Sequence, residues 1–431
     1  MKSFAPLLLV ALCQVAVDAE PSSQVAPPIA APAPQSPPRL SLQECLQQAL
    51  QGNPSLQAAR QRMVAAGGRL TAARALPNPE VQVVPVGSAN DNPVIVTQVF
   101  EVLGKRKHRA RTAESEKQVA EHELRAVELA VLAAVSAAYV DLQEAERAQA
   151  LAEEAAKLAR SLHEAAQRQF DLGDVARAHV VRTRLQVGRV EQESVTARGE
   201  VAVRAAALNW LLGREAATPV APAEELQYAE LEPAPELKAR ALTQRPEVQA
   251  AEAGLSARSQ AVELARAQRN PDLFFQTRLG HDDGGGRSGL TALGLTVPGW
   301  DWGSVRGQVR EAQANLAEQR ALLTAAQNAV SLEVEAALRR LQTSREIVQR
   351  YQTQVVPDAE ELMKMTQVGY EQGATGYLEV IDAQQSLTDA RTALARAVAE
   401  HQRNVVELRR AAGEPFAPAA AGAQTVQGGE Q

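Results

Sequence analysis

The sequence predicts a mainly α fold with a small β part, built from a duplicated unit of a long helix and a β-hairpin. Residues 105–172 contain no proline and consist mostly of Ala, Glu, Gln, Arg and Leu. At about 1.5 Å per residue, one helix over this stretch would be about 100 Å long. Aromatic residues make up only 3% of the 431 residues and charged residues 22%, which suits long amphipathic helices better than one large globular core.

A helix of this length needs partner helices, because no single compact core could bury it. Apolar residues recur in it at alternating steps of three and four, which is the spacing of a coiled-coil seam. The seam consists of Ala148, Leu151, Ala155, Leu158, Leu162 and Ala165. A second seam is predicted in the later long helix, at Leu341, Ser344, Val348, Tyr351 and Val355, with Leu362 and Met365 continuing the register.

The first 19 residues read as a signal peptide cut after Ala19, since one Lys precedes a short apolar run and a small-residue site. An alternative interpretation makes Cys13 an acylated first residue. We expect no helix to cross a bilayer after this run, because no later stretch approaches 18 consecutive apolar residues. Cys45 is then the only cysteine of the mature chain, so no internal disulfide is expected.

A Pro/Ala-rich, disordered leader is predicted over 20–39 and a first repeat over 40–213. The repeat starts with a capping box formed by Ser41 and Glu44, and Pro54 takes the first position of the next helix. A β-hairpin follows at 79–100, with strands at 80–86 and 93–100 around a turn at 87–92. The long helix 105–172 and a return helix 175–212 complete the repeat.

A connector at 214–235 leads to a second repeat over 236–412, and a flexible tail is predicted at 413–431. The second β-hairpin is expected at 271–297, with strands 273–279 and 290–297 around a turn at 281–289. Its long helix is predicted at 304–371 and its return helix at 377–412. Pro357 should kink the second long helix because proline removes a backbone donor, whereas the first long helix has Lys157 at that point.

Matched landmarks indicate that the two halves are copies of one unit. Arg245-Pro246 corresponds to Asn53-Pro54, and Asn270-Pro271 corresponds at the same offset to Asn78-Pro79. The four strands have two interpretations. Strands pooled from several copies could close into a membrane barrel, with Phe100, Trp300 and Trp302 as an interfacial aromatic girdle. Alternatively, two soluble hairpins would cap a coiled-coil bundle.

The segment Gln98-Val99-Phe100-Glu101-Val102-Leu103-Gly104-Lys105-Arg106, the duplicated plan and the Asn-Pro-x-Leu and Arg-Pro-Glu-Val signatures carry a family resemblance. Together they resemble the TolC-like outer-membrane efflux factors, and most of all their CzcC-like, heavy-metal branch. The resemblance covers residues 40–412.

The resemblance implies a homotrimer, with a trimeric α-barrel in the periplasm and a twelve-stranded β-barrel in the lipid of the outer membrane. It also implies the function of an exit duct in a tripartite exporter, with a periplasmic membrane-fusion adaptor and an inner-membrane pump of the resistance-nodulation-division type. The cargo implied is heavy-metal cations. The alternatives are a duct for drug efflux or type I protein secretion, and a soluble periplasmic coiled-coil scaffold or adaptor.

In the family, a gate lies at the periplasmic tip, and its acidic positions correspond to Glu379 and Asp382 here. The alternative is that both are helix N-terminal acids favoured by the macrodipole. Tyr370 corresponds to a tyrosine that ties the closed state, but its usual acidic and basic partner positions hold His179 and Thr375. A Tyr–His hydrogen bond and a solvent-facing His both remain open.

The resemblance implies that two turns receive the adaptor. The outer turn is Gly173, Asp174, Val175, Ala176 and Arg177, and the inner turn is Gly373, Ala374, Thr375 and Gly376.

No catalytic or metal-binding pattern accompanies these features. The six histidines are scattered, and no nucleophile elbow, P-loop or dinucleotide fingerprint occurs in the sequence. The net charge of −6 is spread with both signs interleaved, which does not point to nucleic acid. We therefore expect no enzyme activity, no cofactor, no resident metal and no nucleic-acid partner.

Overall fold

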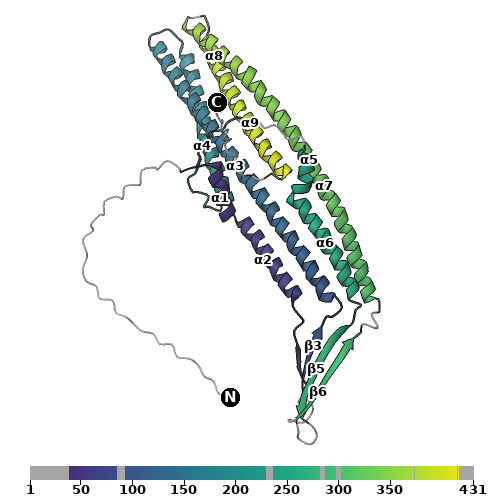
Figure 1. Ribbon diagram of the computed structural model, residues 1–431. Helices are drawn as coiled ribbons and strands as arrows, with labels where there is room; N and C mark the ends of the chain where they lie inside the picture. Colours follow the sequence, from purple (N-terminus) through teal and green to yellow (C-terminus); the bar gives the residue numbers. More distant parts are fainter. Residues whose placement is uncertain are drawn as a thin grey trace, which may run out of the picture. The chain divides into compact units, whose positions relative to one another are not determined.

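The computed structural model describes residues 38–84, 93–229, 236–281, 287–297, 302–372, 374–414 and 416. All of them lie in one compact unit, Pro38–Gln431. Long helices dominate this unit, and a four-stranded sheet lies at one end of them (Figure 1). The predicted mainly α class with a small β part is confirmed.

The first repeat begins with a capping box in which the Glu44 N–H donates to the Ser41 hydroxyl and the Glu44 carboxylate accepts from the Ser41 N–H, as predicted. Pro54 opens the following helix, capped by the side chain of Asn53. The elements of this repeat are β1 (Arg39–Leu40), α1 (Leu42–Gly52), α2 (Pro54–Arg74), β2 (Glu80–Val83), β3 (Val94–Phe100), α3 (Lys105–Asp171) and α4 (Arg177–Leu212).

The second repeat follows the same order after a short strand in the connector. Its elements are β4 (Ala221–Pro222), α5 (Leu237–Gln244), α6 (Pro246–Ala267), β5 (Asp272–His281), β6 (Arg287–Thr296), α7 (Ser304–Arg350), η1 (Tyr351–Val355), α8 (Val356–Glu371) and α9 (Tyr377–Ala412).

Three predicted segments differ from the structure. The end of the predicted disordered leader is ordered, because β1 pairs in parallel with β4 of the connector. The strands of the second hairpin are longer than expected, at 10 residues each. In the first hairpin β2 ends at Val83, and the predicted turn at 87–92 lies outside the described residues.

The long helices form a row that is one helix thick. α3 packs against α2 and α4 on one side and against α6 and α9 on the other, and α7 packs against α6 and α9 (Figure 1). A side-chain network joins the repeats across this row: the Arg403 guanidinium on α9 donates to Asp141 and Glu144 on α3, at 2.7 and 2.8 Å.

A second, shorter layer covers the middle of the row on one face. α1 contacts α3 and α4, and α5 contacts α6, α7 and α9. The Tyr139 hydroxyl, on α3, bonds to the Leu40 carbonyl oxygen of β1 and to the Glu224 carboxylate after β4. The two largest clusters of buried apolar side chains include residues of this layer, one cluster in each repeat, so the layer packs against the row through apolar contacts.

The same joint recurs in both repeats and supports the duplication. The Asn53 side-chain amide donates to the Leu211 carbonyl at the end of α4, and the Arg245 guanidinium donates to the Arg410 and Ala411 carbonyls at the end of α9. Both return helices then end in a left-handed glycine, Gly213 (φ 72°) or Gly413 (φ 71°). A side chain at Gly213 could not fit, since its Cβ would lie 2.3 Å from the Gly52 carbonyl oxygen.

The predicted coiled-coil seam of α3 is correct in part. Leu151 and Ala155 are buried, but Leu158 is 37% exposed. Ala156 and Ala159 instead pack against Val190 of α4. The buried stripe of α3 is therefore rotated relative to the predicted seam, because α4 packs against only one side of α3. In the second seam Leu341, Ser344 and Val348 are buried, whereas Val355, Leu362 and Met365 lie 37–58% exposed.

Pro357 is accommodated by a π-helical segment rather than within a continuous α-helix. The five residues of η1 directly precede α8, whose second residue is Pro357. Proline has no N–H to donate to the carbonyl four residues before it. The π turn before Pro357 replaces the usual hydrogen bonds between residues four apart with bonds between residues five apart. α3 has no such interruption between Lys105 and Asp171.

Candidate functional site

Two regions of the structure bear on function, namely the helix tips and the sheet. At the tips, the turn between α3 and α4 lies beside the turn between α8 and α9 (Figure 1). Gly173 has a φ of 87°, which allows the Asp174 N–H to donate back to the Gln169 carbonyl at 2.9 Å. In the inner turn, Ala374 and Thr375 both donate backbone N–H groups to the Gly369 carbonyl, and Gly373 lies outside the described residues.

The two turns enclose a cleft of about 570 Å³. It brings together the predicted positions Asp174, Val175, His179, Tyr370, Thr375 and Gly376, and its remaining lining residues are Ala166, Gln169 and Tyr377. The predicted turn positions Gly173, Ala176, Arg177 and Ala374 lie beside the cleft in the chain without lining it. The sequence positions of both turns therefore converge in space, although some 200 residues separate them.

One hydrogen bond across the cleft joins the two repeats: the Tyr370 hydroxyl donates to Gln169 Oε1 at 3.2 Å. The open alternative of a Tyr370–His179 hydrogen bond is thus not what this structure contains. His179 is half-buried, and its ring centroid lies 6.5 Å from that of Tyr377. The Thr375 hydroxyl donates to the Thr366 carbonyl at 3.0 Å, within the inner helix pair formed by α8 and α9.

Tyr377 is the centre of a small aromatic cluster at the first position of α9. Its ring meets that of Tyr370 edge-on, with centroids 6.1 Å apart. Its side chain is buried, and this burial, with a smaller contribution from Tyr370, raises the pKa of Tyr377 to about 12. The phenol therefore stays neutral at physiological pH.

Glu379 and Asp382 are both exposed on the first turns of α9. Their spacing of three residues places them on one face of that helix. Neither carboxylate forms an ion pair with a residue in the described part of the chain. The pair is thus free to face an external partner or a second copy of the chain, and the macrodipole explanation for them is also compatible with this geometry.

Sequence reasoning missed Gln169 and Tyr377. A glutamine in a long Gln-rich helix carries no signal of its own, so only the fold could identify Gln169 as the partner of Tyr370. Tyr377 had a usable signal, since an aromatic residue directly after a glycine-rich turn is unusual in a chain with only 3% aromatics.

The sheet contains four antiparallel strands in the order β2-β3-β5-β6. Its register places one set of apolar side chains on a single face, because directly opposed residues point the same way. On that face lie Val81, Val83, Val94, Val96, Phe100, Leu273, Phe275, Leu279, Leu293 and Leu295, with the polar residues Gln98, Thr277 and Thr291 among them. The opposite face holds Glu80, Gln82, Thr97, Gln276, Arg278 and Thr296, together with Ile95, Val99, Phe274 and Leu290.

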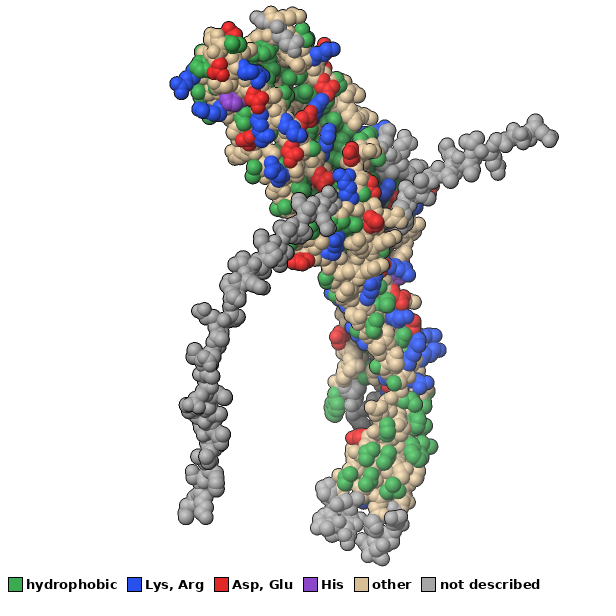
Figure 2. Space-filling model, turned by 90° about the vertical axis from the view of Figure 1, so that its left-hand side faces the viewer, with side chains coloured by type: hydrophobic (Ala, Val, Ile, Leu, Met, Phe, Trp, Pro, Cys, Tyr) green, Lys and Arg blue, Asp and Glu red, His purple; other side chains and the backbone are tan. Residues whose placement is uncertain are grey.

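The apolar face is not covered by any other described part of the chain. Leu293 is 69% exposed, Val83 62% and Leu279 53%. Figure 2 shows hydrophobic side chains gathered over this end of the molecule, while charged side chains of both signs are interleaved over the helices. An uncovered apolar surface of this kind marks a contact with lipid or protein.

Both outer strands of the sheet, β2 and β6, have no partner on their outer edges within the described residues. On the polar face the Phe274 ring covers Gly294, where a Cβ would lie 2.3 Å from the ring. Trp302, just beyond this sheet, is 92% exposed, and Trp300 lies outside the described residues.

The joint between sheet and helices is held by ion pairs that the family-like segment 98–106 supplies. Lys105 Nζ, on an almost fully buried side chain, bonds to Asp272 Oδ2 at 2.7 Å and so ties α3 of the first repeat to β5 of the second. Arg109 binds Glu101 at 2.6 Å and also the Ala73 and Ala75 carbonyls at the end of α2.

Among the described residues, no group of three or more His, Cys, Asp or Glu side chains is placed to hold a metal ion. Of the described helices, only α3 has a window apolar enough to span a membrane, with a mean hydropathy of 1.5. Half of this window is buried within the protein, as in a core helix, so the expectation that no helix crosses a bilayer stays a prediction.

The profile of the outer membrane efflux protein family matches this chain twice, over residues 45–214 and 237–414. The two matches coincide with the two repeats. The cobalt-zinc-cadmium resistance protein CzcC of Cupriavidus metallidurans is 26% identical over 370 residues, which span 82% of this chain and 85% of that protein.

Solved structures with the same fold include three membrane proteins. CusC superimposes with a TM-score of 0.76 at 20% identity, and the match covers 94% of this chain and 100% of the CusC chain. A membrane protein from Pseudomonas aeruginosa gives a TM-score of 0.74 at 23% identity, covering 90% and 100%. The open state of the MtrE channel of Neisseria gonorrhoeae gives 0.74 at 20%, covering 86% and 89%.

The family consists of ducts rather than enzymes, and its members act as trimers with adaptors and pumps in tripartite efflux systems. They reside in the outer membrane, with most of the chain in a periplasmic helical tunnel. This residence rules out the soluble scaffold as an interpretation. With both repeats matched over most of the chain, this protein belongs to the outer membrane efflux protein family and is an outer-membrane efflux channel.

Proposed function

We propose that three copies of this chain form one continuous duct, with a twelve-stranded β-barrel in the outer membrane and an α-barrel in the periplasm. The observation that carries the proposal is the sheet, which has one uncovered apolar face and two unpaired edge strands. An open sheet edge is not tolerated in lipid, so β2 of one chain must pair with β6 of the next. Closure then directs the apolar face to the lipid and the polar face to the lumen.

The helices support the same arrangement. The row of helices ends in α2 and α4 on one side and in α7 and α8 on the other, and both ends carry exposed apolar side chains. On α4 these are Leu185, Val195, Val203 and Trp210, at 60–73% exposure. On α7 and α8 they are Leu322, Leu332, Ile347 and Met365, at 44–70%. Two different apolar edges make a head-to-tail contact, which closes into a ring.

Membrane fractionation and gel electrophoresis test this assembly. The protein should fractionate with the outer membrane and run as a trimer that heating converts to a single chain. A stable, water-soluble single chain would contradict the proposal.

We infer that the cargo is heavy-metal cations. The inference rests on the similarity to CzcC, a protein named for cobalt, zinc and cadmium resistance, and on the match of segment 98–106 to that branch. Drugs or a secreted protein are the alternative cargoes. Deletion of the gene should lower tolerance to cobalt, zinc, cadmium or copper and leave tolerance to dyes unchanged; the reverse pattern would favour the drug duct.

The gate of the duct is proposed at the helix tips. In a trimer, Glu379 and Asp382 would each form a ring of three exposed carboxylates, which attracts cations. Replacement of both by Ala should weaken block of single-channel conductance by divalent cations. Unchanged block would assign the two acids to the helix macrodipole alone.

The Tyr370–Gln169 hydrogen bond is proposed to hold the inner helix pair against the outer pair in the closed state. Tyr370→Phe removes the donor and keeps the ring, so the tip should open more often and single-channel conductance should rise. Thr375→Val is a matched control, because its hydroxyl bonds only within the inner pair.

The adaptor is proposed to seat on the two turns, at Gly173, Asp174, Val175, Ala176 and Arg177 and at Gly373, Ala374, Thr375 and Gly376. The support is their convergence around one cleft at the end of the helices. Cross-linking from Asp174→Cys to a co-expressed adaptor, with a Cys at exposed Arg125 as the distant control, tests the location.

A further inference from the structure

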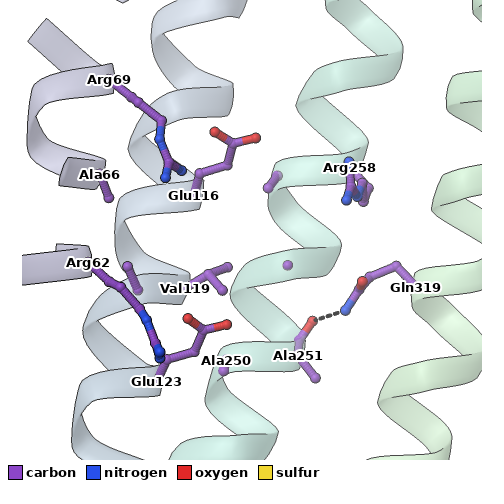
Figure 3. A pocket seen from close by; sticks show the side chains of 13 residues that line it. Arg62, Ala66, Arg69, Glu116, Val119, Glu123, Ala250, Ala251, Arg258 and Gln319 are labelled. Carbon is purple, nitrogen blue, oxygen red and sulfur yellow. Dashed lines mark hydrogen bonds between the residues drawn. The ribbon is translucent and has the colours of Figure 1, made fainter. Parts of the chain in front are cut away.

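A second cleft lies away from the helix tips, on the part of the helix row between the second layer and the sheet. It has a volume of about 500 Å³ and is lined by four consecutive helices, α2, α3, α6 and α7 (Figure 3). Its charged residues are Arg62 and Arg69 on α2, Glu116 and Glu123 on α3, and Arg258 on α6. The only neutral polar side chain in the lining, Gln319 of α7, is engaged by the Ala251 carbonyl at 3.2 Å.

The charged side chains of this cleft do not form ion pairs with one another. All five side chains are exposed, and none of them forms an ion pair within 4.0 Å in the part of the chain that the structure describes. Figure 3 shows Arg62 and Arg69 extending from α2 over α3, at the levels of Glu123 and Glu116. With three guanidinium groups against two carboxylates, the cleft carries a net positive charge.

Helical phase shows which face of the row the cleft occupies. Tyr139 points into the second layer, where its hydroxyl meets β1 and the connector. At about 3.6 residues per turn, Glu123 precedes Tyr139 by about four and a half turns and Glu116 by about six and a half. Both glutamates therefore lie on the face of α3 opposite to the second layer.

In the proposed duct this face is the inner one. α1, α5 and the β1–β4 pair would obstruct the channel if they lay inside it, so they belong to the outer surface. The cleft on the opposite face then lines the lumen, and three copies place nine arginines and six glutamates around it at one level.

We infer that Arg62, Arg69 and Arg258 form a basic collar in the lumen that attracts small anions and lowers the passage of cations relative to them. This rests on the proposed trimeric duct and not on its proposed cargo, and the collar changes relative permeability without excluding cations. Guanidinium groups bind chloride and oxyanions without losing their charge at any working pH. Rings of such groups select for anions in pores. The lumen would then carry charge of opposite sign at two levels, with carboxylates at the tip and arginines nearer the membrane.

Reversal potentials of the purified trimer in a planar bilayer, under a roughly ten-fold KCl gradient, test the collar. Arg62→Gln, Arg69→Gln and Arg258→Gln combined should lower the chloride-to-potassium permeability ratio by about two-fold. Glu116→Gln with Glu123→Gln should raise the ratio. Both shifts should shrink as ionic strength rises, because salt screens the charges.

Arg125→Gln is the matched control. Arg125 is exposed on α3 and precedes Tyr139 by about four whole turns, so it lies on the outer face with the second layer. Its substitution should leave the permeability ratio unchanged. A shift with Arg125→Gln and none with the three cleft arginines would overturn the inference, because the faces would then be assigned the wrong way round.

Different results would overturn the basic collar and the trimeric duct. A channel that conducts with an unchanged ratio in both the arginine and the glutamate variants overturns the collar alone. A wild-type chain that forms no trimeric channel overturns the duct and the collar together. If the triple arginine variant does not assemble, the glutamate pair decides, since its expected shift has the opposite sign and removes no positive charge.

Discussion

Arg245 and Asn53 occupy equivalent positions in the two repeats, and different side chains perform the same task there. Each donates to carbonyls at the end of its return helix, where the last turn of an α-helix leaves carbonyls without partners. Arg245 is only 2% exposed, and it is also held by Glu247 and Glu333. A buried charge is tolerated here because all three nitrogen atoms of the guanidinium donate hydrogen bonds.

Arg245→Ala should lower the free energy of unfolding by about 3–5 kcal/mol, because it leaves two carbonyls at the end of α9 and the Glu247 carboxylate without their donor, while Glu333 keeps Arg410. Chemical denaturation of the detergent-solubilised protein measures the loss. The control is Arg240→Ala on α5, whose ion pair with Glu414 is exposed and should cost less than about 1 kcal/mol. Equal losses at the two sites would contradict the role of burial.

Tyr377 predicts a pH dependence at the same scale. Burial raises the pKa of Tyr377 to about 12, from the ordinary tyrosine value of 10.0. Between these two values the unfolded chain has lost the phenol proton and the folded chain has kept it. The contribution of Tyr377 to the free energy of unfolding is therefore unchanged below pH 10, and it falls by roughly 1–3 kcal/mol as the pH rises towards 12.

Tyr377→Phe has no proton to lose, so this part of the alkaline loss should disappear while the rest remains. Denaturation midpoints measured at several pH values, for the wild type and the variant, check the difference. Parallel pH curves for the two proteins would remove Tyr377 as the source.

Among the elements, the two long helices differ although they come from one repeated unit. α3 runs without interruption, whereas the second long helix changes to π geometry over Tyr351–Val355 just before Pro357. The sequence predicted an irregularity at this proline from the missing donor. It did not predict the form of the irregularity, because the neighbouring helices decide whether the backbone bends or widens.

Pro357→Ala should restore regular α-helical bonding and raise stability, while Lys157→Pro should lower it by about 3 kcal/mol by breaking α3. Thermal denaturation compares the two, and hydrogen exchange at Tyr351–Val355 reports the local change. Slower exchange in Pro357→Ala is the expected result; unchanged exchange would mean that packing, and not the proline, imposes the π turn.

At the scale of the whole molecule, the sheet and the helices have surfaces that a single chain leaves uncovered. The apolar sheet face, the unpaired edges of β2 and β6 and the apolar sides of α4, α7 and α8 are all explained by one assembly. Lys105 and Asp272 keep the sheet aligned with the helices, since they join the first repeat to the second at the strand ends.

Leu293→Arg tests the lipid-facing role of the apolar sheet face. A charge there should destabilise the membrane-inserted state by about 2–4 kcal/mol and reduce the yield of trimer in the outer membrane. Gln276→Arg is the control on the opposite face, which would line a water-filled lumen. Equal loss of trimer in both variants would contradict the assignment of the faces.

Much of the architecture follows from local patterns. Capping residues, prolines and glycines set the helix ends, so Ser41, Pro54, Gly104, Gly213 and Pro246 were sufficient to locate them. The sequence located the helix tips themselves, but the gate and adaptor-docking roles of their residues came from a family resemblance. His179 and Thr375 depart from the usual pattern of that family. The partner of Tyr370 could not be found in this way, since Gln169 is one of many glutamines in its helix.

The order and type of the long helices and the hairpins, and their duplication, were contained in the sequence alone, because helix caps, proline positions and apolar periodicity act over a few residues. The β1–β4 pair and the π segment η1 were not predicted. Only the tertiary structure decided that α4 rotates the buried stripe of α3, that Tyr370 bonds to Gln169, and that four helices bring three arginines to one cleft. These outcomes depend on contacts between residues that lie far apart in the chain, and no local pattern encodes which of several chemically similar side chains will meet.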